Sequence, residues 1–309
     1  MISQATPNGL IVAILAICFS FVVSQIAQAE YKRGYVDTRS GQVHYYRATP
    51  QTDVKPKTPI IFLHPNGKSG QIFEYMIKEM GRDRIAVAFD MPGYGGSDPI
   101  DQPSDMTELA QIIADSIRGL GYGSAGVGAG ASKVDIFGFH TGSVLATELS
   151  LKHPDLIRRI ILSGIPLRTR EQRKVRFDNV PWGEPISEDK VEYAWVSTME
   201  TRDDDVTIED AAKTFSENIR LLVNPWWNVY GAVWTYPLEE RLPELTVPTL
   251  VLNPVDGEFD VTRTAYERLL KNASYVELPQ ITNIYHPFTP EPYWRLWSDE
   301  LRKWLDAPV

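Results

Sequence analysis

The segment Val134-Asp135-Ile136-Phe137-Gly138-Phe139-His140-Thr141-Gly142 carries the strongest indication of the fold. It begins as a short apolar run suited to a buried strand and continues into helical spacing over 142–152. A strand that turns sharply into a helix strains the central residue, His140, and only small residues two before and two after it avoid a clash. Glycine occupies both positions. We expect the turn to lift the His140 side chain above the sheet edge and to leave the Thr141 backbone N–H free for an oxyanion.

Strands and helices alternate along most of the chain. A hairpin is expected from 35–37 and 43–46, and further apolar runs suited to buried strands lie at 59–63, 85–89, 160–162 and 249–252. Helical spacing is found around 71–81, 105–119, 142–152 and 262–271, and in the last helix. The order predicts an α/β fold, with a mostly parallel central sheet covered by helices on both faces. The Gly/Ala/Ser-rich segment 121–132 is expected to be a flexible insertion.

Four motifs, in this order along the chain, resemble those of the α/β-hydrolase superfamily. The segment 63–67 resembles its His-Gly oxyanion loop, and 90–98 resembles its D-x-P-G-x-G-x-S-D segment. The turn around His140 resembles the nucleophile elbow, and 285–287 resembles the loop that carries the catalytic histidine. The resemblance covers nearly all of 34–307. It implies an α/β-hydrolase core of residues 30–166 and 241–309, interrupted by a helical cap of residues 167–240.

The resemblance also exposes a departure, because His140 stands where the nucleophile is normally Ser, Asp or Cys. Serine chemistry needs a hydroxyl whose proton passes to a histidine, and imidazole has none. By the same resemblance, His286 matches the general base and Asp256 the acid that orients it. The acid's spacing is one residue short, so Glu258 and Asp260 are alternatives.

The remaining candidate site residues surround this constellation. The resemblance places the second oxyanion donor at the backbone N–H of Asn66, beside that of Thr141. His64 lies in a loop at the same end of the sheet as the other site residues, although this position is commonly a packing residue in the superfamily. Adjacent aromatic residues in a helix cannot all face one core stripe. The expected substrate is a small apolar or aromatic molecule. The candidates for binding it are His64, Trp226, Trp227 and Tyr230.

Four hypotheses for the site follow. In the leading one, His286 with Asp256 acts as general base on water or substrate, and His140 donates a hydrogen bond or serves as a second acid/base. In the second, the protein binds a small ligand without turnover, as a pseudoenzyme. In the third, the His140 imidazole attacks directly. In the fourth, the histidines and Asp256 hold zinc, although no short-range ligand spacing supports a metal. No cofactor is expected.

Composition limits the partners and the location. The chain has 309 residues, a net charge of −9 and a pI near 5.2, which argues against nucleic-acid binding. Residues 1–29 contain no charged side chain, and an apolar run over 10–23 leads to Ala27-Gln28-Ala29. This is typical of a cleaved signal peptide, so we expect an exported, periplasmic or secreted monomer or homodimer without membrane attachment. An uncleaved segment would anchor the protein to a membrane. The only cysteine, Cys18, lies in this segment.

Overall fold

The computed structural model describes residues 29–51, 56–123, 133–202, 206–280 and 293–308. The expectations about the leader lie almost entirely outside the described residues, as do those about most of the insertion over 121–132. The last histidine of the sequence, His286, also lies outside them. No helix in the described part of the chain has the length and apolar character needed to cross a membrane.

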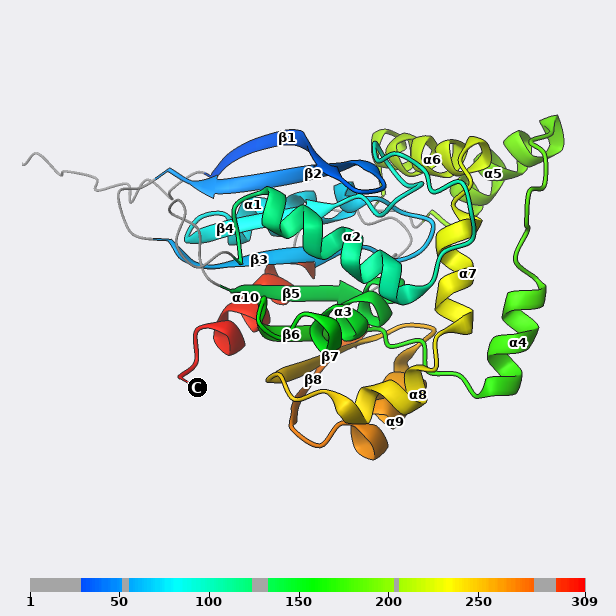
Figure 1. Cartoon of the computed structure of the whole chain (residues 1–309). Coiled ribbons are helices and arrows are strands. Elements are labelled where there is room, and N and C mark those ends of the chain that lie inside the picture. The colour runs from blue at the N-terminus through cyan, green and yellow to red at the C-terminus, as the bar shows by residue number, and fades with distance from the viewer. Residues whose placement is uncertain (1–28, 52–55, 124–132, 203–205, 281–292, 309) are drawn as a thin grey trace, which may run out of the picture.

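Eight strands form one sheet in the order β1-β2-β4-β3-β5-β6-β7-β8 (Figure 1). β1 and β2 form the antiparallel hairpin, β2 is antiparallel to β4, and every later pairing is parallel. The strands are β1 Ala29–Thr38, β2 Gly41–Pro50, β3 Lys57–Leu63, β4 Arg84–Phe89, β5 Val134–Phe139, β6 Ile157–Ser163, β7 Thr249–Val255 and β8 Ala273–Gln280. The predicted α/β fold with a mostly parallel sheet is therefore confirmed.

Helices cover both faces of the sheet, and alternate residues of one strand serve the two faces. In β3, Ile61 and Leu63 pack toward α2 (Met106–Gly119) and α3 (Thr141–Lys152), whereas Ile60 and Phe62 pack toward the other face. That second face is covered by η1 (Gly70–Phe73), α1 (Glu74–Met80) and α10 (Tyr293–Leu305), while α9 (Phe259–Leu269) lies between β7 and β8 in the chain. Burial on both faces explains the continuous apolar runs of the central strands.

Five helices and a short 3₁₀ turn separate β6 from β7. They are α4 Arg170–Asp178, α5 Glu188–Glu200, α6 Ile208–Val223, α7 Trp227–Thr235, α8 Leu238–Arg241 and η2 Leu242–Glu244. Figure 1 shows α4 to α7 gathered at the end of the sheet toward which β5 points. Loops at the carboxyl ends of parallel strands are where ligand sites form in open α/β sheets. We call α4–α7 the cap helices, and they lie at this edge.

Candidate active site

The turn between β5 and α3 has the strained geometry that its sequence predicts. His140 has φ 48° and ψ −112°, and among the described residues it is the only non-glycine with a positive φ. A Cβ at Gly138 would lie 2.3 Å from the carbonyl oxygen of Gly142, and one at Gly142 would lie 2.0 Å from that of Leu63. Such approaches are too close for any side chain. Both glycines are therefore required for the chain to bend here.

The His140 ring is held by Asp256, which follows β7. The His140 Nε2 lies 2.9 Å from Asp256 Oδ2, and Asp256 Oδ1 accepts a 2.7 Å bond from the backbone N–H of Glu258. The Asp256 side chain is only 2% exposed, and that of His140 is 22% exposed. An ionised carboxylate can only accept hydrogen bonds, so Nε2 donates and the lone pair stays on Nδ1. No hydrogen bond in the described part of the chain uses this Nδ1.

Backbone on the far side of the ring completes its support. The His140 N–H donates to the carbonyl oxygen of Ser163, at the end of β6, over 2.9 Å. Gly164 follows with φ +59°, and a Cβ there would lie 2.1 Å from His140 Cδ2 and 2.5 Å from Nε2. Any other residue at position 164 would therefore place its Cβ in the space that the imidazole occupies. β5, β6 and β7 together fix its orientation.

Of the three acids considered from the sequence, Asp256 is the one that contacts an imidazole in the described structure. Glu258 turns away and pairs with Arg168 at 2.8 Å. Asp260 lies exposed in the first turn of α9. His286, the predicted partner of Asp256, belongs to 281–292, outside the described residues. Within the described residues Asp256 forms a hydrogen bond with His140, an arrangement that the sequence did not anticipate.

The two predicted oxyanion donors lie next to each other. The backbone N–H of Asn66 donates to Thr141 Oγ1 over 3.2 Å, so this N–H is occupied in the structure. The Asn66 side chain accepts a 2.5 Å hydrogen bond from the hydroxyl of Tyr94, a fully buried residue whose pKa is raised by burial. The loop that carries Asn66 is thus fixed against both the β5–α3 turn and the segment after β4.

His64 is fully buried, and both of its ring nitrogens bond to backbone. Nε2 accepts from the N–H of Met91 at 2.8 Å, which leaves Nδ1 to donate to the carbonyl oxygen of Pro65 at 2.8 Å. Burial lowers the pKa of His64 to about 4. In this geometry His64 has neither exposed surface nor a free nitrogen for a ligand, and it ties the loop after β3 to the segment after β4.

Asp90 organises the segment that follows β4. Its carboxylate accepts the N–H of Gly70 at 2.7 Å and that of Gly96 at 2.8 Å, and it lies 2.8 Å from His44 Nδ1. A Cβ at Gly95 would lie 2.0 Å from Asp90 Oδ2. Asp90 and the glycines of the segment 90–98 therefore hold this segment against the neighbouring loops.

The aromatic residues predicted to bind substrate form a row along α7. Ring centroids of Trp226 and Trp227 lie 6.4 Å apart, those of Trp226 and Tyr230 5.5 Å, and those of Tyr230 and Trp234 5.4 Å. Trp226, Trp227 and Tyr230 are half-buried against the core. Tyr230 also lines an open groove of about 600 Å³ together with the α4 side of the cap, namely Arg168, Glu171, Gln172, Val175, Arg176 and Asn179. Tyr230 thus lies on a groove.

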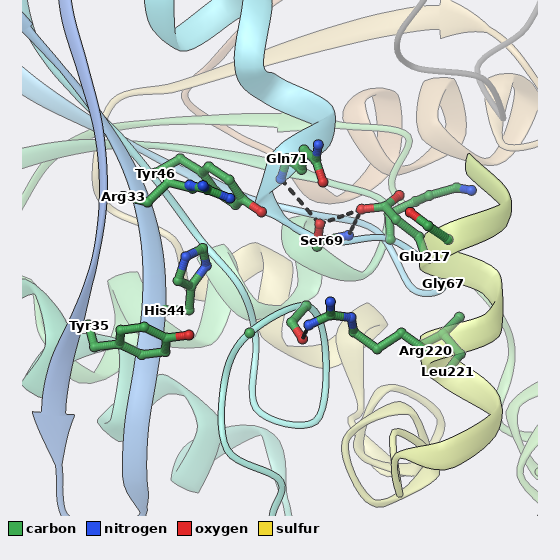
Figure 2. Close-up of a pocket in the computed structure, with 14 residues that line it drawn as sticks. Arg33, Tyr35, His44, Tyr46, Gly67, Ser69, Gln71, Glu217, Arg220 and Leu221 are labelled. Atoms are coloured by element: carbon green, nitrogen blue, oxygen red, sulfur yellow. Dashed lines mark hydrogen bonds between the residues drawn. The ribbon is translucent and has the colours of Figure 1, made fainter. Parts of the chain in front are cut away.

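A contact between the cap and the loop after β3 was not predicted from the sequence. Glu217 of α6 accepts hydrogen bonds from both the N–H and the hydroxyl of Ser69, as Figure 2 shows. Burial raises the pKa of Glu217 to about 7, although Lys68 and the Ser69 hydrogen bonds oppose the shift. The partners are 148 positions apart in the chain, so no local pattern could have paired them.

The metal hypothesis gains no support from the described side chains. They contain no cluster of three or more His, Cys, Asp or Glu residues that could hold an ion. His140 and Asp256 supply two such groups, which is fewer than the three protein ligands of an ordinary catalytic zinc site.

Comparison with known proteins identifies the family. Residues 60–298 match the model of the alpha/beta hydrolase family, and the chain belongs to that family. The chain is 25% identical over 142 residues to epoxide hydrolase 3 of Xenopus tropicalis, covering 45% of this chain and 36% of the relative. It is 24% identical over 117 residues to the (E)-2-((N-methylformamido)methylene)succinate hydrolase of Acinetobacter baylyi, covering 38% of this chain and 41% of the relative. The matches thus span less than half of these relatives' lengths.

The solved structures show the same fold. The Cif epoxide hydrolase from Acinetobacter nosocomialis superposes with a TM-score of 0.69 at 18% identity, covering 88% of this chain and 89% of the other. A thermophilic esterase from Thermogutta terrifontis superposes with a TM-score of 0.61 at 18% identity, covering 90% and 98%. At such identities the likeness concerns the fold, and chemistry must be argued from the side chains.

Proposed function

We propose that the protein is a cofactor-free hydrolase of small apolar or aromatic esters in which His140, oriented by Asp256, is the general base. The observation that carries the proposal is the 2.9 Å hydrogen bond between His140 Nε2 and Asp256 Oδ2 at the strained β5–α3 turn. A buried carboxylate that fixes the tautomer of a half-exposed imidazole is the base-orienting part of a hydrolytic triad. Here the pair stands where a nucleophile would, so water is the nucleophile.

The proposed step needs no covalent intermediate. His140 Nδ1 takes a proton from water as the water oxygen bonds to the ester carbonyl carbon, and the carbonyl electrons move to oxygen. The N–H groups of Thr141 and Asn66 stabilise that oxyanion, the latter after leaving Thr141 Oγ1. Collapse breaks the ester C–O bond, and the imidazolium returns its proton to the departing alcohol. Asp256 remains ionised throughout and stabilises the imidazolium.

The cap suggests the substrate class and the route. The groove between α4 and Tyr230 includes Arg168, whose partner Glu258 lies two residues beyond Asp256. The aromatic row of α7 offers apolar surface on the same side of the sheet. A small ester with an aromatic or short aliphatic acyl group would place its apolar part against Tyr230 and Val175 of this groove.

Hydrolysis of p-nitrophenyl acetate, p-nitrophenyl butyrate and phenyl acetate by the purified protein tests the proposal. We expect turnover that is lost in His140→Ala and falls about 10²–10⁴-fold in Asp256→Asn, because the amide holds the wrong tautomer. Asp260→Asn is the matched control and should retain the wild-type rate. Full activity in His140→Ala with loss only in His286→Ala would replace this proposal with the hypothesis that His286 is the base.

A second candidate, a ligand-binding protein without turnover, is favoured by one contact. The Asn66 N–H, needed as an oxyanion donor, is already accepted by Thr141 Oγ1. Thr141→Val removes the competing hydroxyl at almost constant shape. A faster rate in this variant would support the hydrolase, whereas no turnover in either protein, together with saturable binding of phenyl acetate, would support the silent protein.

A further inference from the structure

A second cavity lies away from the His140–Asp256 pair. It has a volume of about 240 Å³ and forms where the β1–β2 hairpin, the loop after β3 and the cap helix α6 meet (Figure 2). Its lining includes Arg33 and His44 of the hairpin, Ser69 of the loop, and Glu217 and Arg220 of α6. Neither His140 nor Asp256 lines it, so it is distinct from the candidate active site.

Positive charge without a carboxylate partner collects around this cavity. Arg33, Lys68 and Arg220 all line it, and none of them forms an ion pair within the described part of the chain. Arg220 Nη1 donates a hydrogen bond to the carbonyl oxygen of Gly95 over 2.6 Å. Burial lowers the pKa of Lys68 and the neighbouring Glu217 opposes that shift, so Lys68 is coupled to Glu217 and the attraction for an anion depends on the two arginines. Since the protein as a whole carries a net charge of −9, two arginines at one cavity without an ion-pair partner among the described residues point to an anionic occupant.

One buried acid distinguishes this cavity from a simple anion site. Glu217 is 8% exposed, and its Oε1 takes both hydrogen bonds from Ser69. Its Oε2 is buried without any partner among the described residues. A buried carboxylate oxygen without a donor is costly, and a ligand with a hydroxyl group would satisfy it.

We propose that this cavity binds a small oxyanion that carries its own hydroxyl group, of which hydrogen phosphate is the simplest. The anionic oxygens accept from Arg33 and Arg220, and the hydroxyl donates to Glu217 Oε2. A fully deprotonated anion could donate no hydrogen bond to Glu217 and would be repelled by its carboxylate. The site therefore prefers anions that retain a hydroxyl group. The proposal does not depend on the hydrolase function. It gives the cap helix and the oxyanion loop a common ligand.

Calorimetric titration at pH 8 with inorganic phosphate, sulfate and methyl phosphate tests the discrimination. Hydrogen phosphate keeps one hydroxyl at this pH, whereas sulfate and the dianionic monoester have none. We expect phosphate to bind at least about tenfold more tightly than the other two, the ratio that one charge-assisted hydrogen bond supplies. Equal binding of all three, or no binding of phosphate, would overturn the proposal.

Three variants of cavity residues and one control variant locate the binding. Arg33→Gln and Arg220→Gln should each weaken phosphate binding about tenfold or more, whereas Arg170→Gln, an exposed arginine outside the cavity, should leave it unchanged. Glu217→Gln should abolish the preference over sulfate, because the amide can donate as well as accept. Phosphate binding that persists in both cavity arginine variants, or discrimination that survives Glu217→Gln, would place the ion elsewhere and contradict the proposal.

Discussion

At the scale of single residues, the important feature is which nitrogen of His140 is occupied. Asp256 accepts a hydrogen bond from the Nε2–H, so Nδ1 keeps its lone pair. In a serine triad the imidazole stands opposite the turn and reaches toward it. Here the imidazole belongs to the turn itself, so the proposed reaction needs a water molecule beside Nδ1.

A serine at this position tests whether the usual machinery is otherwise present. His140→Ser would place a hydroxyl at the strained turn and free Asp256 to orient another histidine, and the sequence indicates His286. We expect the variant to react covalently with a serine-directed alkylphosphonate, detected as a mass increase on Ser in the tryptic peptide. The wild-type protein, which lacks the hydroxyl, is the control. A folded variant that stays unlabelled would contradict the placement of His286 or of the oxyanion loop.

The candidate site could be predicted from the sequence only in part. The strict size requirements of the turn pointed to His140 and Thr141, whereas the family resemblance of the loop after β3 pointed to Asn66. The choice among Asp256, Glu258 and Asp260 depends on the direction in which each side chain leaves the loop after β7, and no pattern encodes that direction. The contact between His140 and Asp256 depends on Gly164, which belongs to a third loop.

At the scale of elements, the loop after β6 allows the His140 ring to lie against Asp256, because Gly164 in this loop has no side chain. Gly164→Ala would add a Cβ within 2.1 Å of His140 Cδ2 and impose a positive φ on alanine. We expect the ring to be displaced from Asp256, with esterase activity lowered at least about tenfold and stability reduced by about 1–2 kcal/mol or more.

Gly183→Ala separates strain from displacement. Gly183 also has a positive φ, +64°, but a Cβ there meets nothing within 4 Å. This variant should lose about 1 kcal/mol of stability and keep its activity. Urea denaturation and ester hydrolysis on both variants measure the difference. Equal activity of the two proteins would show that the ring does not depend on the space above Gly164.

The elements themselves were largely predictable. Central strands buried on both faces appear as continuous apolar runs, so β3, β4, β5, β6 and β7 were found. The edge strand β8, Ala273–Gln280, was missed because it mixes polar and apolar residues and borders only β7. The hairpin was found but underestimated in length, because β1 is mostly exposed or half-buried and its pairing with β2 carries it to Ala29.

At the scale of the whole molecule, Glu217 connects the cap to the core, and its contribution to the stability of the folded protein depends on pH. Its pKa is raised from 4.5 to about 7 in the folded protein, so the folded state holds this proton more tightly than the unfolded chain. The resulting stabilisation is complete below pH 4.5 and is lost as the pH rises through 7. Lys68 opposes the shift and Asp90 adds to it, so both belong to the same electrostatic cluster.

Glu217→Gln should remove this pH dependence while retaining an acceptor for Ser69. Relative to the variant, the wild-type protein should lose up to about 3 kcal/mol of unfolding free energy between pH 5 and pH 8. Urea denaturation at both pH values measures the difference. If the gap between the two proteins is the same at pH 5 and pH 8, Glu217 does not titrate in this range.

The tautomer of His140 is the most direct test of the account. In ¹⁵N-labelled protein, long-range proton–nitrogen correlation spectra of the ring should show a protonated Nε2 and an unprotonated Nδ1 at neutral pH. Asp256→Asn should disturb that pattern, and Asp260→Asn should not. A proton on Nδ1, or ring signals indifferent to Asp256→Asn, would contradict the claim that Asp256 orients His140 as the base.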